Sequence, residues 1–308
     1  MTVSLSPGGL RSYIDSHEMG MRAASDAGPP VQTVFRYGGF VGASIQAFPS
    51  LGRAMDYCRS HTDEMEEGGK SVLSGTVVVA DLLSGSKGRF SRIWHAPAGG
   101  LWGCMILVNT LVAESVNLLP FALGVSCCEA MREAGAETAV VRWVNDVLVD
   151  GKKAAGFLVE GYHTPLRLEE YCLLGFGINV NNDEFPEELG PTAISLKQVT
   201  RSVVDHDSFC LSYLAKLSWN IGLICYEEQQ KLMSGSYSGP GGSHLLVERF
   251  KQLSDSIGRR VVYGYDVVSR PQYQATVTDI RNDGALVMRL DDGSEIVEHS
   301  GEIRYLQP

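Results

Sequence analysis

Residues 139–162, AVVRWVNDVLVDGKKAAGFLVEGY, contain two short apolar runs, at 147–149 and 154–159. Asp150-Gly151 stands between the runs, and this dipeptide tolerates the positive φ angles of a tight hairpin turn. The stretch therefore predicts a β-hairpin. A Trp-Val-Asn-Asp cluster precedes the first strand and a lysine pair opens the second, which is an uncommon combination for a hairpin.

The two lysines of this hairpin have different predicted environments, because neighbouring side chains on a strand point to opposite faces of the sheet. If Lys152 faces solvent, Lys153 faces the layer that the sheet covers, beside Asn145 or Asp146 on the partner strand. A half-buried lysine in that place is either a salt-bridged structural residue or a cation aimed at an anionic ligand. The hairpin alone leaves both interpretations open.

Length and composition indicate a soluble globular protein. A chain of 308 residues suits one large domain and a small one. Apolar residues make up 44% and charged residues 20% of the chain, as in ordinary globular proteins. The formal net charge of −10 argues against non-specific nucleic-acid binding, which needs a basic surface. We therefore expect no DNA binding.

The cysteines and the apolar segments indicate a cytoplasmic location. The seven cysteines include no Cys-x-x-Cys pair, and most lie in apolar runs, which predicts reduced, buried thiols and no metal site. The first 20 residues lack the pattern of a secretory signal. The longest apolar region, 101–128, is interrupted by polar residues and Pro120, so it predicts a buried strand and helix and no membrane partner.

The remaining pattern divides the chain into three parts. Residues 1–33, rich in Gly, Ser and Pro, predict an irregular, loosely packed extension. Residues 34–257 mix strands and helices. The predicted strands are 35–48, 75–80, 101–108 and 171–180, and the predicted helices are 51–58, 119–134, 208–233 and 244–257. Residues 258–308 contain short strands separated by Asn-Asp-Gly and Asp-Asp-Gly turns, which predicts a small β-barrel as a separate domain.

A basic segment, SGSKGRFSR at 84–92, holds two glycines, three cations and no acid. Glycine-rich backbone can turn its N–H groups inward to form an anion nest, and the cations raise the local potential. The spacing differs from that of a Walker A loop. The segment is either a phosphate-contacting loop or a solvated surface loop. His95, beside a Pro-Gly turn and without a partner in sequence, is interpreted as structural.

These motifs, in this order, resemble the biotin–protein ligases of the wider biotin/lipoate ligase superfamily. RWVNDVLVDGKKAAGFLVE is similar to that family's Lys-Trp-Pro-Asn-Asp … Lys … Ala-Gly-Ile-Leu-Val-Glu hairpin, and GFGINVN to its Gly-Ile-Gly-Ile-Asn-Val motif. Residues 87–101 lie where the family has the adenylate loop Gly-Arg-Gly-Arg-x-Gly-Arg-x-Trp. The C-terminal Gly-Arg-Arg-Val … Gly-Glu-Ile is similar to its SH3-like domain. The resemblance covers residues 35–308 and implies an α+β fold, with a mixed central sheet in the catalytic domain and a small SH3-like β-barrel C-terminal domain.

The resemblance also implies an activity. The family activates biotin with Mg·ATP to biotinyl-5′-AMP and then passes the biotinyl group to a lysine of a carrier domain. The implied cosubstrates are ATP and its bound Mg²⁺. The implied partners are biotin or a related carboxylic acid and the biotin carboxyl carrier domain of a carboxylase, and a homodimer is compatible with the family.

Site residues are carried over by position in the motifs. Lys153 and Arg89 match catalytic cations beside the reacting carboxylate and phosphates. Positions on the acid side are Ser50, Lys87, Arg89, Gly156 and Leu158. Positions on the nucleotide side are Trp94, Asn145, Asp146, Asn179 and Glu302. Fixed cations suit this chemistry, because carboxylate attack on a phosphate brings two anions together.

The sequence departs from the family where biotin's ureido group is contacted. The family's Ser-Thr-Asn falls on Ser50-Leu51-Gly52, and a biotin-contacting glutamine falls on or near Leu83. Leu51 and Leu83 therefore predict apolar walls where the ureido group needs hydrogen-bonding partners. Lys87 and Val144 also replace an arginine and a proline. Three functions stay open: a biotin–protein ligase, a ligase for a less polar acid such as lipoate or octanoate, and a non-catalytic paralogue that binds a ligand or partner.

Overall fold

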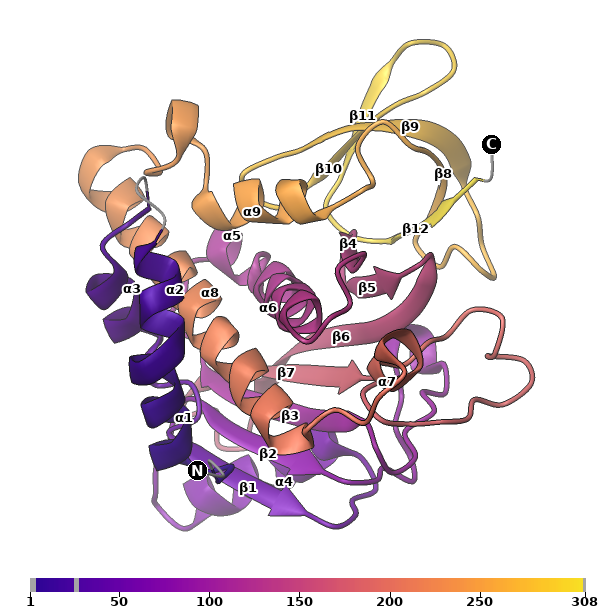
Figure 1. Ribbon diagram of the computed structural model, residues 1–308. Coiled ribbons are helices and arrows are strands. Elements are labelled where there is room, and N and C mark those ends of the chain that lie inside the picture. The colour runs from indigo at the N-terminus through magenta and orange to yellow at the C-terminus, as the bar shows by residue number, and fades with distance from the viewer. Residues whose placement is uncertain (1–3, 25–27, 307–308) are drawn as a thin grey trace.

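The computed structural model describes residues 4–24 and 28–306, which form two β-sheets with helices packed on the larger one (Figure 1). The strand order is β1-β2-β3-β7-β6-β5-β4 in the larger sheet and β11-β10-β9-β8-β12 in the smaller. In the larger sheet β1 runs parallel to β2 and the other neighbours are antiparallel. This confirms the predicted α+β fold with a mixed central sheet and a separate C-terminal sheet.

The larger sheet is built from β1 (Ser44–Phe48), β2 (Thr76–Ala80), β3 (Leu101–Val108), β4 (Val140–Arg142), β5 (Asp146–Val149), β6 (Lys152–His163) and β7 (Glu170–Ile178). Strands β2 and β3 are buried along almost their whole length because both faces of the sheet are covered there. One face packs on α6 (Leu119–Glu133) and α8 (His206–Ser234), and the other packs on α4 (Ala54–Glu67). The cavity described below lies on the α4 side, where helix cover is incomplete.

The organising hairpin forms as predicted. Asp150 and Gly151 both have positive φ, 50° and 76°, and join β5 to β6. The pairing contains one irregularity. Val147 is opposite Ala155, but Leu148 is opposite Lys153, so Ala154 is an extra residue in β6. A bulge of this kind breaks the alternation of side chains and turns the preceding residue toward the other face.

The helices predicted at 119–134 and 208–233 are confirmed as α6 and α8, and the one predicted at 244–257 ends earlier, at Leu253. The helix predicted at 51–58 starts later and runs longer, as α4. Pro120 lies in the first turn of α6, where its missing N–H has no helical partner to lose, and Gly135, with a φ of 102°, follows the helix end. The helices α5 (Ala113–Val116), α7 (Leu196–Thr200) and α9 (Leu245–Leu253) lie in the same part of the chain as α6 and α8.

The prediction of an irregular N-terminal extension is wrong for the described residues. They form α1 (Pro7–Tyr13), a π-helical turn η1 (Ile14–Glu18) and α2 (Met19–Ala23); residues 1–3 and 25–27 of that extension lie outside the described part. The cause is tertiary. Glu18 is fully buried, and its carboxylate binds Arg22 and Lys216 of α8, both at 2.8 Å.

The prediction of strand structure over 35–48 is also wrong in its first half, which belongs to α3 (Val31–Gly38). Gly38 lets α3 cross α8 closely, because a Cβ at this position would lie 1.8 Å from the carbonyl oxygen of Ser218. Only residues 44–48 form the predicted strand.

The smaller sheet contains β8 (Arg260–Gly264), β9 (Tyr273–Ile280), β10 (Leu286–Arg289), β11 (Glu295–Glu298) and β12 (Glu302–Tyr305). Gly284 and Gly293 have positive φ in the predicted turns. All seven cysteines are free thiols, and six of them are buried, as predicted. Among the described residues, none of the helices combines the length and the apolar character that crossing a lipid bilayer requires.

Candidate functional site

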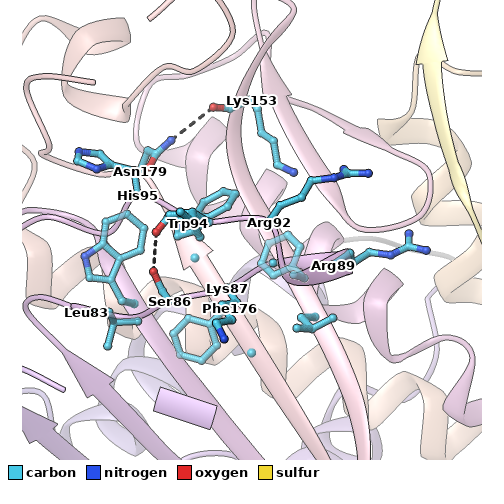
Figure 2. Close-up of a pocket in the computed structure, with 18 of the residues that line it drawn as sticks. Leu83, Ser86, Lys87, Arg89, Arg92, Trp94, His95, Lys153, Phe176 and Asn179 are labelled. Carbon is cyan, nitrogen blue, oxygen red and sulfur yellow. Dashed lines mark hydrogen bonds between the residues drawn. The ribbon is translucent and has the colours of Figure 1, made fainter. Parts of the chain in front are cut away.

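A cavity of about 260 Å³ opens on the α4 side of the larger sheet (Figure 2). Its lining comes from β3, β5, β6 and β7, the start of α4, the basic segment, the loop 185–193 and the first residue of β12. All but one of the predicted site residues line it, namely Lys87, Arg89, Trp94, Asn145, Asp146, Lys153, Gly156, Leu158, Asn179 and Glu302. His95, which was interpreted as structural, lines the cavity as well.

Glycines of β6 and β7 form the floor of the cavity. Gly156 pairs with Gly177, and Gly175 pairs with Leu158. A Cβ at Gly177 would lie 2.7 Å from Nε1 of Trp94, and a Cβ at Gly175 would lie 2.7 Å from Sδ of Met55. Missing side chains at these positions therefore allow other groups to lie directly on the sheet, which is a common reason for glycine inside a strand.

Lys153 faces this cavity. Its Nζ lies 2.6 Å from the Asp146 carboxylate, 5.3 Å from the centre of the Trp94 ring and 3.3 Å from the point where a Cβ of Gly156 would stand. The bulge at Ala154 is the reason, since it brings the Lys153 side chain to the same face as Gly156. The predicted contact between Lys153 and Asp146 is confirmed. The Lys153 side chain is 35% exposed, so its ammonium lies at the cavity instead of in bulk water.

Asp146 anchors two cations. Its carboxylate binds Arg142 at 2.5 Å and Lys153 at 2.6 Å, and its side chain is only 12% exposed. Burial by itself raises the pKa of this carboxyl, but Lys153 and Arg142 outweigh that effect and lower the pKa to about 2. The group is therefore ionised at neutral pH and holds Lys153 by charge as well as by hydrogen bonding.

The two asparagines line the cavity and also brace the backbone around Lys153. The Nδ2 of Asn145 donates to the carbonyl oxygen of Phe157 at 2.7 Å. The Nδ2 of Asn179 donates to the carbonyl oxygens of Ile194, at 3.1 Å, and Lys153, at 3.4 Å (Figure 2). These bonds hold the carboxyl end of β7 against the start of β6. Contact with a nucleotide stays a prediction for both residues.

The basic segment folds back on itself as a short hairpin over the cavity. Ser86 donates through Oγ to the carbonyl oxygen of Trp94 at 2.6 Å (Figure 2), and the N–H of Trp94 donates back to the carbonyl oxygen of Ser86 at 3.1 Å. Lys87 pairs with Ile93 between these residues and the tip. We call residues 86–94 the flap. At its tip Phe90 and Ser91 have φ of 56° and 58°.

The flap is tied to the C-terminal sheet. Both terminal nitrogens of Arg92 bind the two carboxylate oxygens of Glu302, at 3.0 and 2.8 Å, and Arg92 also pairs with Asp266. Arg89 donates to the carbonyl oxygen of Gly301 at 2.6 Å. Burial lowers the pKa of Arg92, but Glu302 and Asp266 outweigh it and raise that pKa. Glu302, predicted on the nucleotide side, thus binds the flap in this structure.

The end of the cavity away from Lys153 is mainly apolar. Leu83 lines it together with Ala54 and Met55, in agreement with the apolar wall predicted at Leu83. Leu51 and Ser50 lie outside the lining, and Ser50 is exposed to solvent, so the structure does not bring Ser50 to the site.

Beside this apolar end, the backbone of residues 51–52 is hydrogen-bonded to the backbone of residues 82–85. Leu51 donates through N–H to the carbonyl oxygen of Leu82 at 3.1 Å, and Ser84 donates to that of Leu51 at 3.0 Å. Gly85 donates to that of Gly52 at 2.8 Å. None of these five residues lines the cavity, so the bonds tie segment 51–52 to segment 82–85 beside the lining residues Leu83 and Arg53.

Sequence reasoning did not single out three residues that shape the site. Arg92 was noted only as one cation of the basic segment, although its position in the motif was a usable signal. Arg53 and Met55 line the cavity from the first turn of α4. Nothing in their local sequence indicates this, because α4 reaches the cavity only through its packing on β3 and β7.

Comparisons with known proteins connect this geometry to ligases. The model of the "Biotin/lipoate A/B protein ligase family" matches residues 59–179. The chain is 25% identical over 245 residues to a biotin–[acetyl-CoA-carboxylase] ligase of Mycobacterium tuberculosis, covering 76% of this chain and 80% of the relative. It is 35% identical over 134 residues to the bifunctional ligase/repressor BirA of Bacillus subtilis, where the match spans 42% of this chain and 41% of that protein.

The fold has a counterpart among solved structures. The biotin protein ligase of Aquifex aeolicus, solved in complex with biotin and ATP, superposes with a TM-score of 0.64 at 21% identity. The match covers 85% of this chain and 99% of the Aquifex chain. At this identity the comparison supports the fold.

Proposed function

We propose that this chain is a member of the biotin/lipoate protein ligase family and acts as a biotin–protein ligase, which forms biotinyl-5′-AMP from biotin and Mg·ATP and transfers the biotinyl group to a carrier-protein lysine; the match to the family model and the similarity to the Mycobacterium tuberculosis ligase support it. The observation that carries the proposal is the position of Lys153, whose ammonium is held by Asp146 over a glycine floor inside the cavity.

In the first step a carboxylate oxygen of the acid attacks the α-phosphorus of ATP, and the bond to pyrophosphate breaks. Lys153 stabilises the approach of the two anions and the charge that develops between them. Arg89 and Lys87, from the flap, add positive potential on the opposite side of the cavity. Bound Mg²⁺ belongs to the ATP substrate and neutralises its phosphates.

In the second step the carrier lysine attacks the acyl carbonyl, and AMP leaves. The mixed anhydride has to be protected from water until then, and the flap covers the cavity for that purpose. Glu302 contributes by holding Arg92 and thereby the flap. Trp94, Asn145, Asp146 and Asn179 form the nucleotide side, and Gly156 and Leu158 form the floor beneath the acid. Residues 34–257 are the catalytic domain, and 258–308 are the SH3-like domain that closes on it.

A ligase for a less polar acid, such as lipoate or octanoate, is the second candidate. The apolar end formed by Leu83, Ala54 and Met55 favours it. An apolar acid would leave no buried polar group unmatched there.

Pyrophosphate release from Mg·ATP, measured separately with biotin, lipoate and octanoate, tests the proposal. Release with biotin alone supports a biotin–protein ligase. Release with lipoate or octanoate alone selects the second candidate. If none of the acids causes release, the protein is a non-catalytic paralogue and the proposed activity is wrong.

A further inference from the structure

The cavity has a second cation, at the end away from Lys153. Arg53 directly precedes α4, lines the cavity and has a side chain that is only 16% exposed. Its terminal nitrogens bind Asp56 at 3.1 Å and Glu160 at 3.2 Å, and one of them lies 3.5 Å from Sδ of Met55. Because Met55 lies over Gly175, these contacts place the guanidinium above the far part of the glycine floor.

The distance between the two cations is comparable to the length of an extended carboxylic acid. The Lys153 ammonium lies over Gly156, whereas the Arg53 guanidinium lies between Gly175, which pairs with Leu158, and Glu160. Along β6 that is two to four residues, or about 7–13 Å at the usual rise of a strand. An acid whose carboxylate meets Lys153 and whose chain follows the floor would therefore bring its far end to Arg53.

The charge around Arg53 indicates what kind of group it would bind. A guanidinium has five N–H donors. In Arg53, three of these donors are directed to Asp56, Glu160 and Met55 within the described part of the chain. The other two have no partner there, and Arg53 is one of the residues that line the cavity. The two carboxylates already offset the positive charge, so this end suits a neutral hydrogen-bond acceptor better than a second anion.

We propose that Arg53 determines the specificity of this site for the acid, by donating hydrogen bonds to a neutral carbonyl oxygen at the end of the acid opposite its carboxylate. The ureido oxygen of biotin is such an acceptor, whereas lipoate and octanoate have none. Arg53 then supplies the polar contact that Ser50 does not make. This inference rests on the proposed ligase function.

Arg59 provides a matched control. It binds the same two acidic residues, Glu160 and Asp56, from the next turns of α4, but it is not among the residues that line the cavity. Substituting methionine for either arginine removes one cation from the same pair of carboxylates and keeps most of the apolar stem. Only Arg53→Met changes the cavity.

Calorimetric titration of the full chain with biotin, and separately with ATP, tests the inference. Arg53→Met should raise the dissociation constant for biotin about 10- to 100-fold, the usual effect of losing a hydrogen bond from a charged donor. Its ATP affinity should stay within about twofold of the wild type, and Arg59→Met should leave both affinities unchanged. Arg53→Lys, which keeps the charge and loses the planar fork, should fall between wild type and Arg53→Met for biotin.

Three results overturn the inference. Unchanged biotin affinity in Arg53→Met shows that the guanidinium makes no contact with the acid. Equal losses of biotin and ATP affinity, or equal losses in Arg53→Met and Arg59→Met, show a structural role through α4. If the wild type releases pyrophosphate with lipoate and does not bind biotin, the ligase activity stands while Arg53 has no carbonyl to recognise. If Arg53→Met does not fold, the Arg53→Lys titration decides by the same criteria.

Discussion

The Lys153 ammonium lies 2.6 Å from the Asp146 carboxylate across the β5–β6 hairpin, and a one-residue bulge at Ala154 brings it there. Without the bulge, Lys153 would share a face with Ala155 and Phe157, which are buried in the main core. With it, the ammonium lies over Gly156 at the cavity. A local backbone irregularity thus turns a strand residue into the central cation of the site.

Lys153→Ala should reduce adenylate formation by about a hundred- to a thousandfold, because a preorganised charge at the reacting atoms typically stabilises the transition state by about 3–4 kcal/mol. Lys152→Ala, the neighbour on the same strand, is the control and should leave the rate within about threefold of the wild type. Pyrophosphate release under saturating ATP and acid is the measurement. Substantial turnover by Lys153→Ala, with a native circular dichroism spectrum, would remove the proposed role.

Arg92→Met should loosen the flap, since it breaks the two bonds to Glu302 and the pair with Asp266. We expect faster limited proteolysis within residues 86–94 and about a tenfold rise in KM for ATP. The adenylate should also hydrolyse faster, because the flap no longer excludes water. Arg260→Met, which breaks a bidentate pair with Asp291 on the exposed side of the C-terminal sheet, is the control. The same proteolysis rate in both variants would contradict the coupling between the flap and the C-terminal sheet.

Gly177→Ala should displace Trp94 from the cavity floor. The new Cβ would lie 2.7 Å from Nε1 and 2.8 Å from Cε2 of a rigid ring, so the indole must move. We expect a change in tryptophan emission, at least tenfold weaker ATP binding and a loss of about 1–3 kcal/mol in the free energy of unfolding. Gly161→Ala, in β6, is the control because a Cβ there would meet nothing within 4 Å. Unchanged ATP binding by Gly177→Ala would show that the position of Trp94 is unimportant.

Asp146 should make the free energy of unfolding depend on pH. The folded pKa of about 2 lies below the ordinary value of 3.8, so the group stabilises the protein above pH 4 and this contribution is lost as the pH falls from about 4 toward 2. The shift corresponds to about 2 kcal/mol. Urea unfolding of wild type and Asp146→Asn at several pH values measures it. The two free energies should differ at pH 7 and converge below pH 3, and a constant difference across this range would be inconsistent with the pairing.

Lys216→Met should lower the free energy of unfolding by about 3–5 kcal/mol, because it leaves buried carboxylates without one of their cations. Lys216 is 2% exposed and binds Glu18 at 2.8 Å and Glu133 at 2.7 Å. Lys231→Met, in the last turn of the same helix, removes an exposed pair with Glu114 and should cost less than about 1 kcal/mol. Chemical unfolding measures both variants, and equal losses would show that burial adds nothing to the pairing.

Much of the fold and of the site was predictable from sequence, because the relevant signals are local. The Asp150-Gly151 turn, the apolar strands β3 and β7 and the long amphipathic α8 all follow from spacing over a few residues. The order of the motifs also identified the residues that meet at the cavity, apart from Ser50. Such patterns reflect backbone geometry that each segment adopts largely by itself.

Tertiary packing decided the rest. The helical N-terminus depends on Glu18 meeting Lys216 almost 200 positions later, and the contact between Arg92 and Glu302 joins segments more than 200 positions apart. Neither contact is indicated by the residues that neighbour it in sequence. Arg53 reaches the cavity only because α4 packs on the sheet. The sequence by itself determined most of the strands, the long helices α6 and α8 and which charges the site contains, since these follow from neighbouring residues. The folded structure alone determined which charges meet and which way Lys153 points, since those depend on register and on distances between remote segments.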